Sequence, residues 1–214
     1  EAPQAAIRVL APGPMSKVVS PIVLKAYVKP GDEGQIRVEL LGEDGRLLQR
    51  YVFNQPTLNV EGAYVSMKIP FEVRAAAELG RLQIVTEDEF GRPQNQAAVH
   101  LLLLSVGDSE LNPADAPYER CVFYEPQAYG GTLILNGEIQ PFNETPVIFE
   151  IVDEAGKVLG LRVLTFEGGN REPFGTTIAY KVTEQTSARL IVRQADDRIS
   201  GLIYLHSQEI ILNP

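Results

Sequence analysis

One stretch of the sequence occurs twice, and this internal repeat constrains the fold more than any other feature. Residues 22–48 align without a gap with residues 133–159, at an offset of 111. The matches include Pro30 with Pro141, Glu33 with Glu144, Glu39 with Glu150, Gly45 with Gly156 and Leu48 with Leu159. A repeat of this length in a chain of 214 residues predicts two domains in a row, each large enough to enclose its own core.

Short alternating strands are predicted throughout both copies. In residues 35–41, Ile36, Val38 and Leu40 fall on one face and polar side chains on the other, which is the period of a strand with one wet face. Seven or so such strands per copy, with turn signals about every 8–12 residues and no periodic helix, predict an all-β chain of two β-sandwiches. We expect copy 1 at residues 1–106, a linker at 107–117 and copy 2 at 118–214.

The charge of the chain is uneven. The net charge is −9, of which residues 1–107 carry −1 and residues 108–214 carry −8. Nucleic acid is not an expected partner, because binding to phosphates needs a clustered basic face. No apolar run approaches the roughly 20 residues of a membrane-spanning helix. The single cysteine, Cys121, excludes an intrachain disulfide and is expected to be a buried thiol.

Catalytic motifs are missing from the sequence. There is no G-x-S-x-G motif, and nucleophilic sites of the Ser-His-Asp or Cys-His kind need a histidine. The two histidines, His100 and His206, fall in or near the last strand of separate copies, so we expect them to lie far apart as ordinary strand residues. Zinc-ligand spacing is absent too. A carboxylate pair of the glycosidase kind stays open among 28 acids, but the chain is interpreted as non-enzymatic.

Acidic residues gather in two turns and in the linker. They are Glu87, Asp88 and Glu89 in copy 1, Asp108, Glu110 and Asp115 in the linker, and Asp196 and Asp197 in copy 2. Calcium takes several carboxylate and carbonyl oxygens, and acids at the junction of two sandwiches can hold an ion that stiffens the pair. A calcium site made by the copy 1 turn with Asp108 and Asp115 is one interpretation, and solvated turns are the other. No further cofactor is predicted.

Four aromatic residues cluster around the start of copy 2: Tyr118, Tyr124, Tyr129 and Phe142. Sugars stack on exposed rings, so these residues are candidates for carbohydrate binding. Packing in the core or at the domain junction is the alternative.

A second binding candidate is the strand at residues 146–152. Val147, Phe149 and Ile151 face one way there, whereas Ile148 and Val152 face the other. We therefore expect Ile148 to lie on an outer face that copy 1 or a partner covers.

Both copies resemble the immunoglobulin-like domain of bacterial spore germination. The resemblance rests in copy 2 on Gly137, Phe142-Asn143-Glu144, Ala155-Gly156-Lys157-Val158-Leu159 and Pro173-Phe174, and in copy 1 on Ser20-Pro21 and Asp44-Gly45-Arg46-Leu47-Leu48. Copy 1 departs from the pattern at Ala26 and Gly31, and copy 2 has Gly131-Thr132 in place of Ser-Pro. The resemblance implies an exported module of the cell envelope and brings no catalytic residues.

These observations together predict a non-catalytic module, extracellular or in the envelope. It would act as a spacer or as a protein-binding or adhesion unit through sandwich edges and loops. The alternative is a carbohydrate or cell-wall binding module that uses the copy 2 aromatics. Exposed rings along an acidic groove would favour this alternative, whereas buried rings under a smooth surface would favour the spacer.

Overall fold

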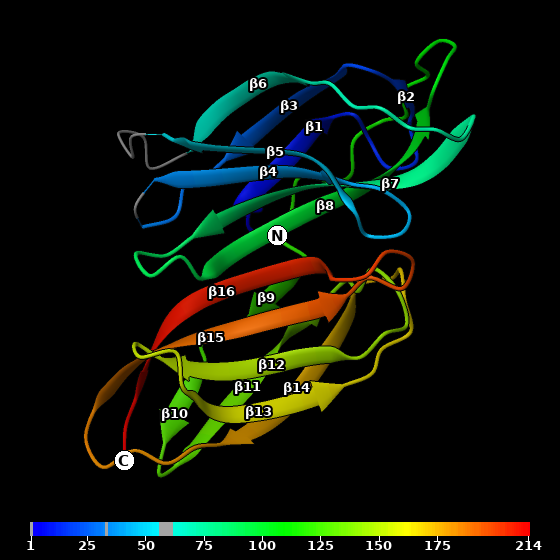
Figure 1. The fold of residues 1–214 in the computed structure, drawn as a ribbon. Coiled ribbons are helices and arrows are strands. Elements are labelled where there is room, and N and C mark those ends of the chain that lie inside the picture. Colours follow the sequence, from blue (N-terminus) through cyan, green and yellow to red (C-terminus); the bar gives the residue numbers. More distant parts are fainter. Residues whose placement is uncertain (1, 33, 56–61) are drawn as a thin grey trace.

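The computed structural model describes residues 2–32, 34–55 and 62–214, which form strands and no helix (Figure 1). Copy 1 contains β1 (Ile7–Ala11), β2 (Lys17–Val19), β3 (Ile22–Val28), β4 (Gln35–Leu41), β5 (Leu47–Asn54), β6 (Ala63–Ile69), β7 (Ala77–Glu87) and β8 (Pro93–Leu104). Copy 2 contains β9 (Cys121–Phe123), β10 (Gln127–Tyr129), β11 (Thr132–Ile139), β12 (Val147–Asp153), β13 (Val158–Leu164), β14 (Glu172–Ala179), β15 (Thr186–Ala195) and β16 (Leu202–Leu212). Within these ranges no helix that could cross a membrane was found.

The strands form three sheets. A small sheet in copy 1 has the order β1-β3-β6, and a four-stranded sheet in copy 2 has the order β10-β11-β14 with β9 also paired to β11. The third sheet has nine strands and spans both copies, in the order β13-β12-β15-β16-β8-β7-β4-β5 with β2 added in parallel to β8. The all-β prediction is confirmed, and the layers are consistent with β-sandwiches. The immunoglobulin-like assignment stays a prediction, and the shared sheet was not predicted.

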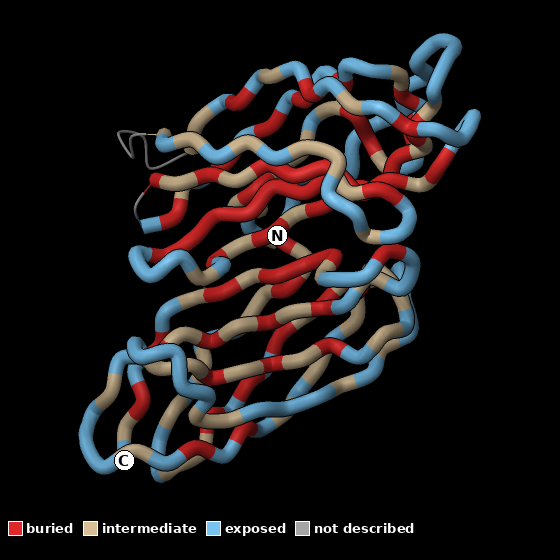
Figure 2. Tube along the Cα trace, in the orientation of Figure 1, coloured by how far each residue is buried: buried red, intermediate tan, exposed pale blue. Residues whose placement is uncertain are grey.

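Each copy buries a cluster of aliphatic side chains between its sheets (Figure 2). In β4, Ile36, Val38 and Leu40 are at most 1% exposed, so the inward face was predicted correctly. The opposite face is not simply wet, because Glu39 there is 6% exposed and pairs with Arg50. In copy 2, Phe149 is the largest fully buried side chain and lies against Phe123 and Phe174. Each fully buried aliphatic or phenyl side chain stabilises the fold by roughly 1.5–3 kcal/mol, so each copy holds together around its own core.

The two copies meet as the subunits of a twofold dimer do. β8 and β16 occupy the same place in the repeat and pair antiparallel, with Gln96 opposite Leu205. These two residues are themselves equivalent, because they face Val85 and Arg193 at matching positions of β7 and β15. An interface in which each half presents the same surface to the other is isologous. We call the region where β8 pairs with β16 the joint, and it reproduces twofold symmetry within one chain.

Hairpins and loops at the joint follow the same symmetry. Ser200 lies in the β15–β16 loop and Gly45 in the β4–β5 hairpin. A Cβ added to Gly45 would lie 3.7 Å from the Ser200 Cβ. Gly156 is the repeat equivalent of Gly45. A Cβ added to Gly156 would lie 3.2 Å from Nη1 of Arg92, in the β7–β8 loop. Arg92 also donates to the carbonyl of Glu154 in that hairpin, at 3.2 Å. Each copy thus lays one loop beside the hairpin of the other.

A buried ion pair breaks this symmetry. Arg81 is 2% exposed, and its Nη1 donates to Asp196 Oδ2 at 2.7 Å and to the carbonyl of Ile199 at 2.7 Å. His100 Nε2 lies 2.8 Å from the same Asp196 oxygen. Burial of the Asp196 carboxyl opposes its ionisation, but the hydrogen bonds from His100 and Arg81 outweigh this and hold its pKa well below the usual range.

The equivalent arginine on the other side of the joint is weakly held. Arg189 Nη2 lies 3.6 Å from Asp32 Oδ2 and 3.5 Å from Glu209 Oε1, and its side chain is 21% exposed. Both acids are more exposed than the arginine. One end of the joint is therefore locked by a desolvated pair, and the other end is solvated.

The two arginines make a matched test of the joint. Arg81→Met leaves Asp196 as a buried carboxylate without its arginine partner, and we expect the free energy of unfolding to fall by about 3–5 kcal/mol. Arg189→Met removes contacts of 3.3–3.6 Å to Ser207, Asp32 and Glu209 and should cost about 0–1 kcal/mol. Urea denaturation of the full chain measures both. Equal effects of the two substitutions would contradict the asymmetry.

Candidate functional site

The outer face of the copy 2 four-stranded sheet carries a row of side chains along β11. Leu133, Leu135 and Ile139 point into the core, so the alternate positions point outward. We call these outward positions, together with the residue that follows the strand end on the same side, the β11 row: Thr132, Ile134, Asn136, Glu138 and Gln140. At about 3.3 Å per residue the row is about 26 Å long.

Three of the predicted aromatic residues border this row. Tyr129 pairs with Thr132 at one end and is 80% exposed. The backbone N–H of Tyr124 donates to the Asn136 carbonyl at 2.8 Å in the middle, with 51% of the residue exposed. Tyr118, 47% exposed, lines a pocket with Glu138 and Gln140 at the other end. The structure thus brings these three tyrosines to one face, spaced along one strand.

Two hollows lie along the row. The first, of about 460 Å³, is lined by Phe123, Tyr124, Glu125, Gln127, Ile134 and Asn136. The second, of about 370 Å³, is lined by Ala2, Asp115, Ala116, Tyr118, Arg120, Glu138, Gln140 and Arg171. Both volumes fall in the range of ligand sites, and both combine rings with amide and carboxylate groups. A hydrogen bond to Glu138 raises the pKa of Tyr124, which ties the middle of the row to its Tyr118 end.

Phe142 does not join the other rings. It packs against the copy 2 core, with its ring 6.0 Å from that of Tyr204, and the Arg120 guanidinium covers it at 3.6 Å. Core packing, the alternative that the sequence left open, therefore describes Phe142.

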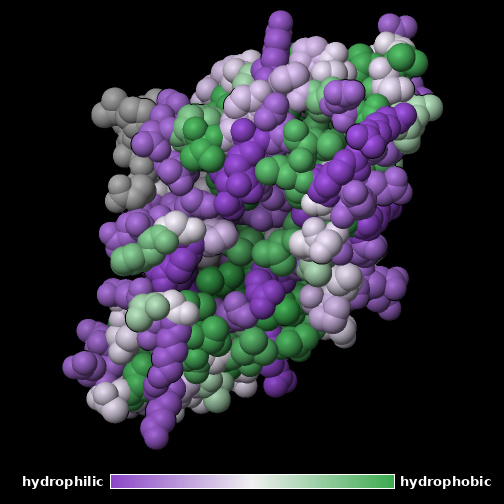
Figure 3. Space-filling view, in the orientation of Figure 1, coloured by the Kyte–Doolittle hydropathy of each residue, from purple (hydrophilic) through white to green (hydrophobic). Residues whose placement is uncertain are grey.

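Ile148 lies on a different surface, the outer face of the nine-stranded sheet. It sits opposite Val163 of β13 and Arg193 of β15, and β15 and β16 separate its strand from copy 1. With the half-exposed Val158, Leu161 and Val163 it forms an apolar patch, and Figure 3 shows hydrophobic side chains gathered on the copy 2 part of this face. The expected cover by copy 1 is therefore wrong, and a partner remains a proposal.

The acids predicted to bind calcium are not brought together. Three are paired with arginines: Glu87 with Arg37 at 3.0 Å, Asp88 with Arg92 at 2.7 Å and Asp115 with Arg120 at 3.0 Å. Glu89 and Asp108 are exposed in two different segments. In the described part of the chain, no group of three or more His, Cys, Asp or Glu residues is arranged to hold a metal ion.

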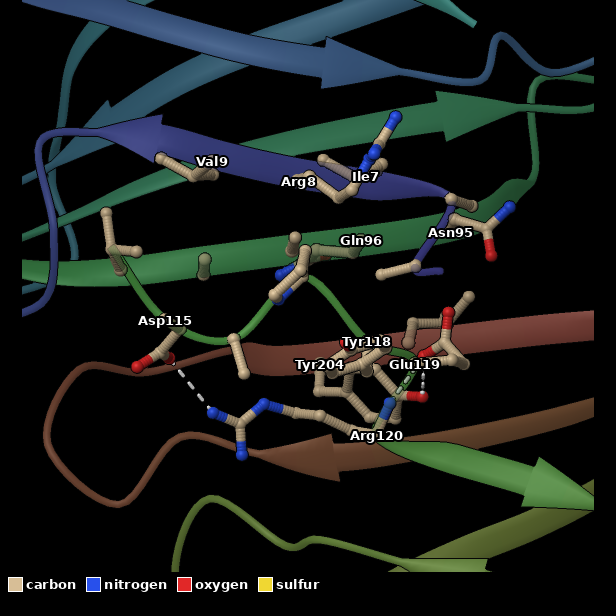
Figure 4. Close-up of a pocket in the computed structure, with 18 of the residues that line it drawn as sticks. Ile7, Arg8, Val9, Asn95, Gln96, Asp115, Tyr118, Glu119, Arg120 and Tyr204 are labelled. Carbon is tan, nitrogen blue, oxygen red and sulfur yellow. Dashed lines mark hydrogen bonds and ion pairs between the residues drawn. The ribbon is translucent and has the colours of Figure 1, made fainter. Parts of the chain in front are cut away.

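A polar cluster that the sequence did not predict lies at the inner side of the joint (Figure 4). Tyr204 donates its hydroxyl proton to Glu119 Oε1 at 2.5 Å and accepts the N–H of Cys121 at 3.1 Å. His206 Nδ1 lies 3.0 Å from Asn95 Oδ1 of copy 1 and 3.5 Å from Glu119 Oε2. His206 and His100 thus both bond across the joint, and neither is an ordinary strand residue of its own copy.

The chemistry of this cluster is structural. Burial raises the pKa of Tyr204 and of Cys121 and lowers that of His206, so all three groups are neutral near pH 7. A buried, protonated thiol is inert. The adjoining cavity, between β1, β8 and the linker, measures only about 90 Å³, well below the size of a ligand site. Sequence reasoning missed the cluster because its members come from strands and linker of both copies.

Comparison with known proteins identifies no family: no family model matches the chain, and no curated protein matches it. Solved structures with some likeness include the BSP domain of a biofilm-associated protein, at 11% identity and a TM-score of 0.28 over 94% of this chain and 29% of that one. Red sea bream transglutaminase is similar at 10% identity and a TM-score of 0.34, over 98% of this chain and 32% of that one. An exo-chitosanase of Amycolatopsis orientalis is similar at 12% identity and a TM-score of 0.33, over 88% of this chain and 25% of that one.

The chain spans a third or less of the length of each of these three proteins. At TM-scores this low, the likenesses carry no argument about function, which has to come from the geometry of the β11 row and its surroundings.

The buried histidine predicts a pH dependence of stability. Because burial lowers the pKa of His206, the unfolded chain takes up a proton near pH 6.5 that the folded chain does not. The stability contributed by the neutral ring is therefore complete above pH 6.5 and is lost as the pH falls, by up to about 1.4 kcal/mol per unit. We expect His206→Gln to flatten the dependence of unfolding free energy on pH between 7 and 5. Urea denaturation at several pH values measures this, and an unchanged slope would contradict it.

Proposed function

We propose that the protein is a non-catalytic module that binds carbohydrate through the outer face of the copy 2 four-stranded sheet. The observation that carries the proposal is the set of three exposed tyrosines, Tyr118, Tyr124 and Tyr129, along the β11 row. An envelope or extracellular location is part of the proposal and rests on the resemblance to the immunoglobulin-like domain of bacterial spore germination.

The groups on this face suit a sugar chain. Tyrosine presents an apolar ring with a polar tip, so it can stack on the C–H face of a sugar and still hydrogen-bond to a hydroxyl. Asn136, Glu138 and Gln140 supply carbonyl and carboxylate acceptors, and the amides supply donors as well.

The joint supports the Tyr118 end of the row. Tyr118 forms a β-bridge with Gln4, and the Glu119 N–H donates to the Pro3 carbonyl at 2.8 Å. The segment that carries Tyr118 is thus held by the start of copy 1. Copy 1 acts in this proposal as a scaffold that fixes one end of a binding face whose other residues lie in copy 2.

Co-sedimentation with isolated bacterial cell walls, with soluble wall glycans as competitors, tests the proposal. Tyr124→Ala and Tyr129→Ala should each weaken retention about three- to tenfold, because each removes one stacking ring. Tyr64→Ala is the matched control, since Tyr64 is 52% exposed on β6 of the copy 1 small sheet. Retention that is absent, or that all three substitutions leave unchanged, would contradict carbohydrate binding by this face.

A second candidate function, protein binding, rests on the apolar patch of Ile148, Val158, Leu161 and Val163. Exposed apolar side chains that lie together mark interaction sites more often than scattered ones do. If the patch binds a second copy of this chain, Ile148→Arg should weaken self-association at least tenfold in sedimentation equilibrium. Val23→Arg is the control, since Val23 is 46% exposed on β3 of copy 1. A wild type that stays monomeric at all concentrations would rule out this pairing.

A further inference from the structure

Two arginines stand at the Tyr118 end of the β11 row, in the hollow of about 370 Å³. Arg120 is held on three sides. Its Nη2 donates to Asp115 Oδ2 at 3.0 Å, its Nη1 donates to the Gln140 carbonyl at 3.2 Å, and its guanidinium lies over the Phe142 ring. Arg120 therefore has a fixed position and a partner for its charge.

Only one of the two terminal nitrogens of Arg171 has a hydrogen-bond acceptor among the described residues. Its Nη2 donates to the Glu119 carbonyl at 2.7 Å, whereas its buried Nη1 has no acceptor among the described residues. A carbonyl does not neutralise the charge of a guanidinium. Leaving a buried donor unpaired is unfavourable, and the penalty is larger for a charged group. Among the described residues Arg171 therefore has no carboxylate partner for its charge, and it lines the hollow.

The acids around the hollow are already engaged. Asp115 pairs with Arg120, and Glu138 lies near enough to Tyr124 to raise the pKa of that tyrosine. Burial lowers the pKa of Arg120, and the nearby charge of Arg171 adds to this while Asp115 opposes it. The two guanidinium groups therefore repel each other across the hollow, and an anion near Arg171 would relieve this repulsion.

We propose that this end of the row binds the carboxylate of an acidic sugar, an inference that rests on the carbohydrate-binding function proposed above. A planar carboxylate matches a guanidinium in shape and forms charge-assisted hydrogen bonds with it. Tyr118 offers its ring to the same sugar, and Gln140 and Glu138 offer hydrogen bonds to its hydroxyls. Asp115 and Glu138 lie close by, so a single negative charge fits better than the double charge of a phosphate monoester.

Isothermal titration calorimetry with the full chain tests this assignment, using three probes of equal length. They are an oligogalacturonate, the same oligomer with its carboxyl groups reduced to neutral alcohols, and a glycerol phosphate oligomer. We expect the wild type to bind the acidic sugar at least tenfold more tightly than the neutral one, with a difference that shrinks as salt is added. Arg171→Gln should remove this difference and leave binding of the neutral oligomer unchanged.

Control variants separate the parts of the proposal. Arg162→Gln removes an exposed arginine from β13 and should not change the preference. Tyr124→Ala should weaken both sugars to the same extent. Equal binding of acidic and neutral sugars by the wild type would overturn the carboxylate site and leave carbohydrate binding standing. Preference for the glycerol phosphate oligomer would overturn the carboxylate assignment. No binding of any probe would also overturn it, and co-sedimentation with cell walls would then decide carbohydrate binding separately.

Discussion

The arrangement of the molecule depends on the desolvated contact between Arg81 and Asp196. Both side chains are removed from water, and a charge buried alone would be strongly unfavourable, so each holds the other in place. The arginine belongs to a strand of copy 1 and the aspartate to a loop of copy 2. This one contact therefore closes the joint at one end of the β8–β16 pairing. The linker and the first residues of the chain cover the inner side of the same joint.

The joint is symmetric in its backbone and asymmetric in its chemistry. The hairpins and loops of the two copies meet in equivalent ways, yet the acids near Arg189 are exposed, whereas Asp196, the partner of Arg81, is buried. The small sheets differ as well: in copy 1 the exposed Tyr27 and Tyr64 pack against each other with ring centroids 5.4 Å apart, whereas in copy 2 three exposed tyrosines are spread along the β11 row.

The candidate site was predicted in part. Tyr118, Tyr124 and Tyr129 were selected because they lie near one another in the sequence. Pairing with β11 puts Tyr129 and Tyr124 beside the outward residues Thr132 and Asn136, and Tyr118 lines the hollow at the end of the row. Phe142 has the same chemistry and proximity, but Pro141 and the end of β11 turn its ring into the core. Arg171 could not be selected, because it lies some 50 residues from Arg120 and only the pairing of β11 with β14 brings the two together. The acids did not form a calcium site because three of them pair with arginines, two of these close in the sequence (Arg92 with Asp88, Arg120 with Asp115) and one distant (Arg37 with Glu87).

By itself, the sequence determined the all-β class and the strand faces, because a period of two and a glycine in a tight hairpin are local properties of the chain. It also revealed the repeat, because both copies carry the same pattern of apolar residues and therefore bury the same strand faces. Only the tertiary structure decided that the copies share one sheet and that His100 and His206 both bond across the joint. It alone decided that two arginines meet at the end of the β11 row. These features depend on contacts between segments up to about a hundred residues apart, whose relative placement no local pattern specifies.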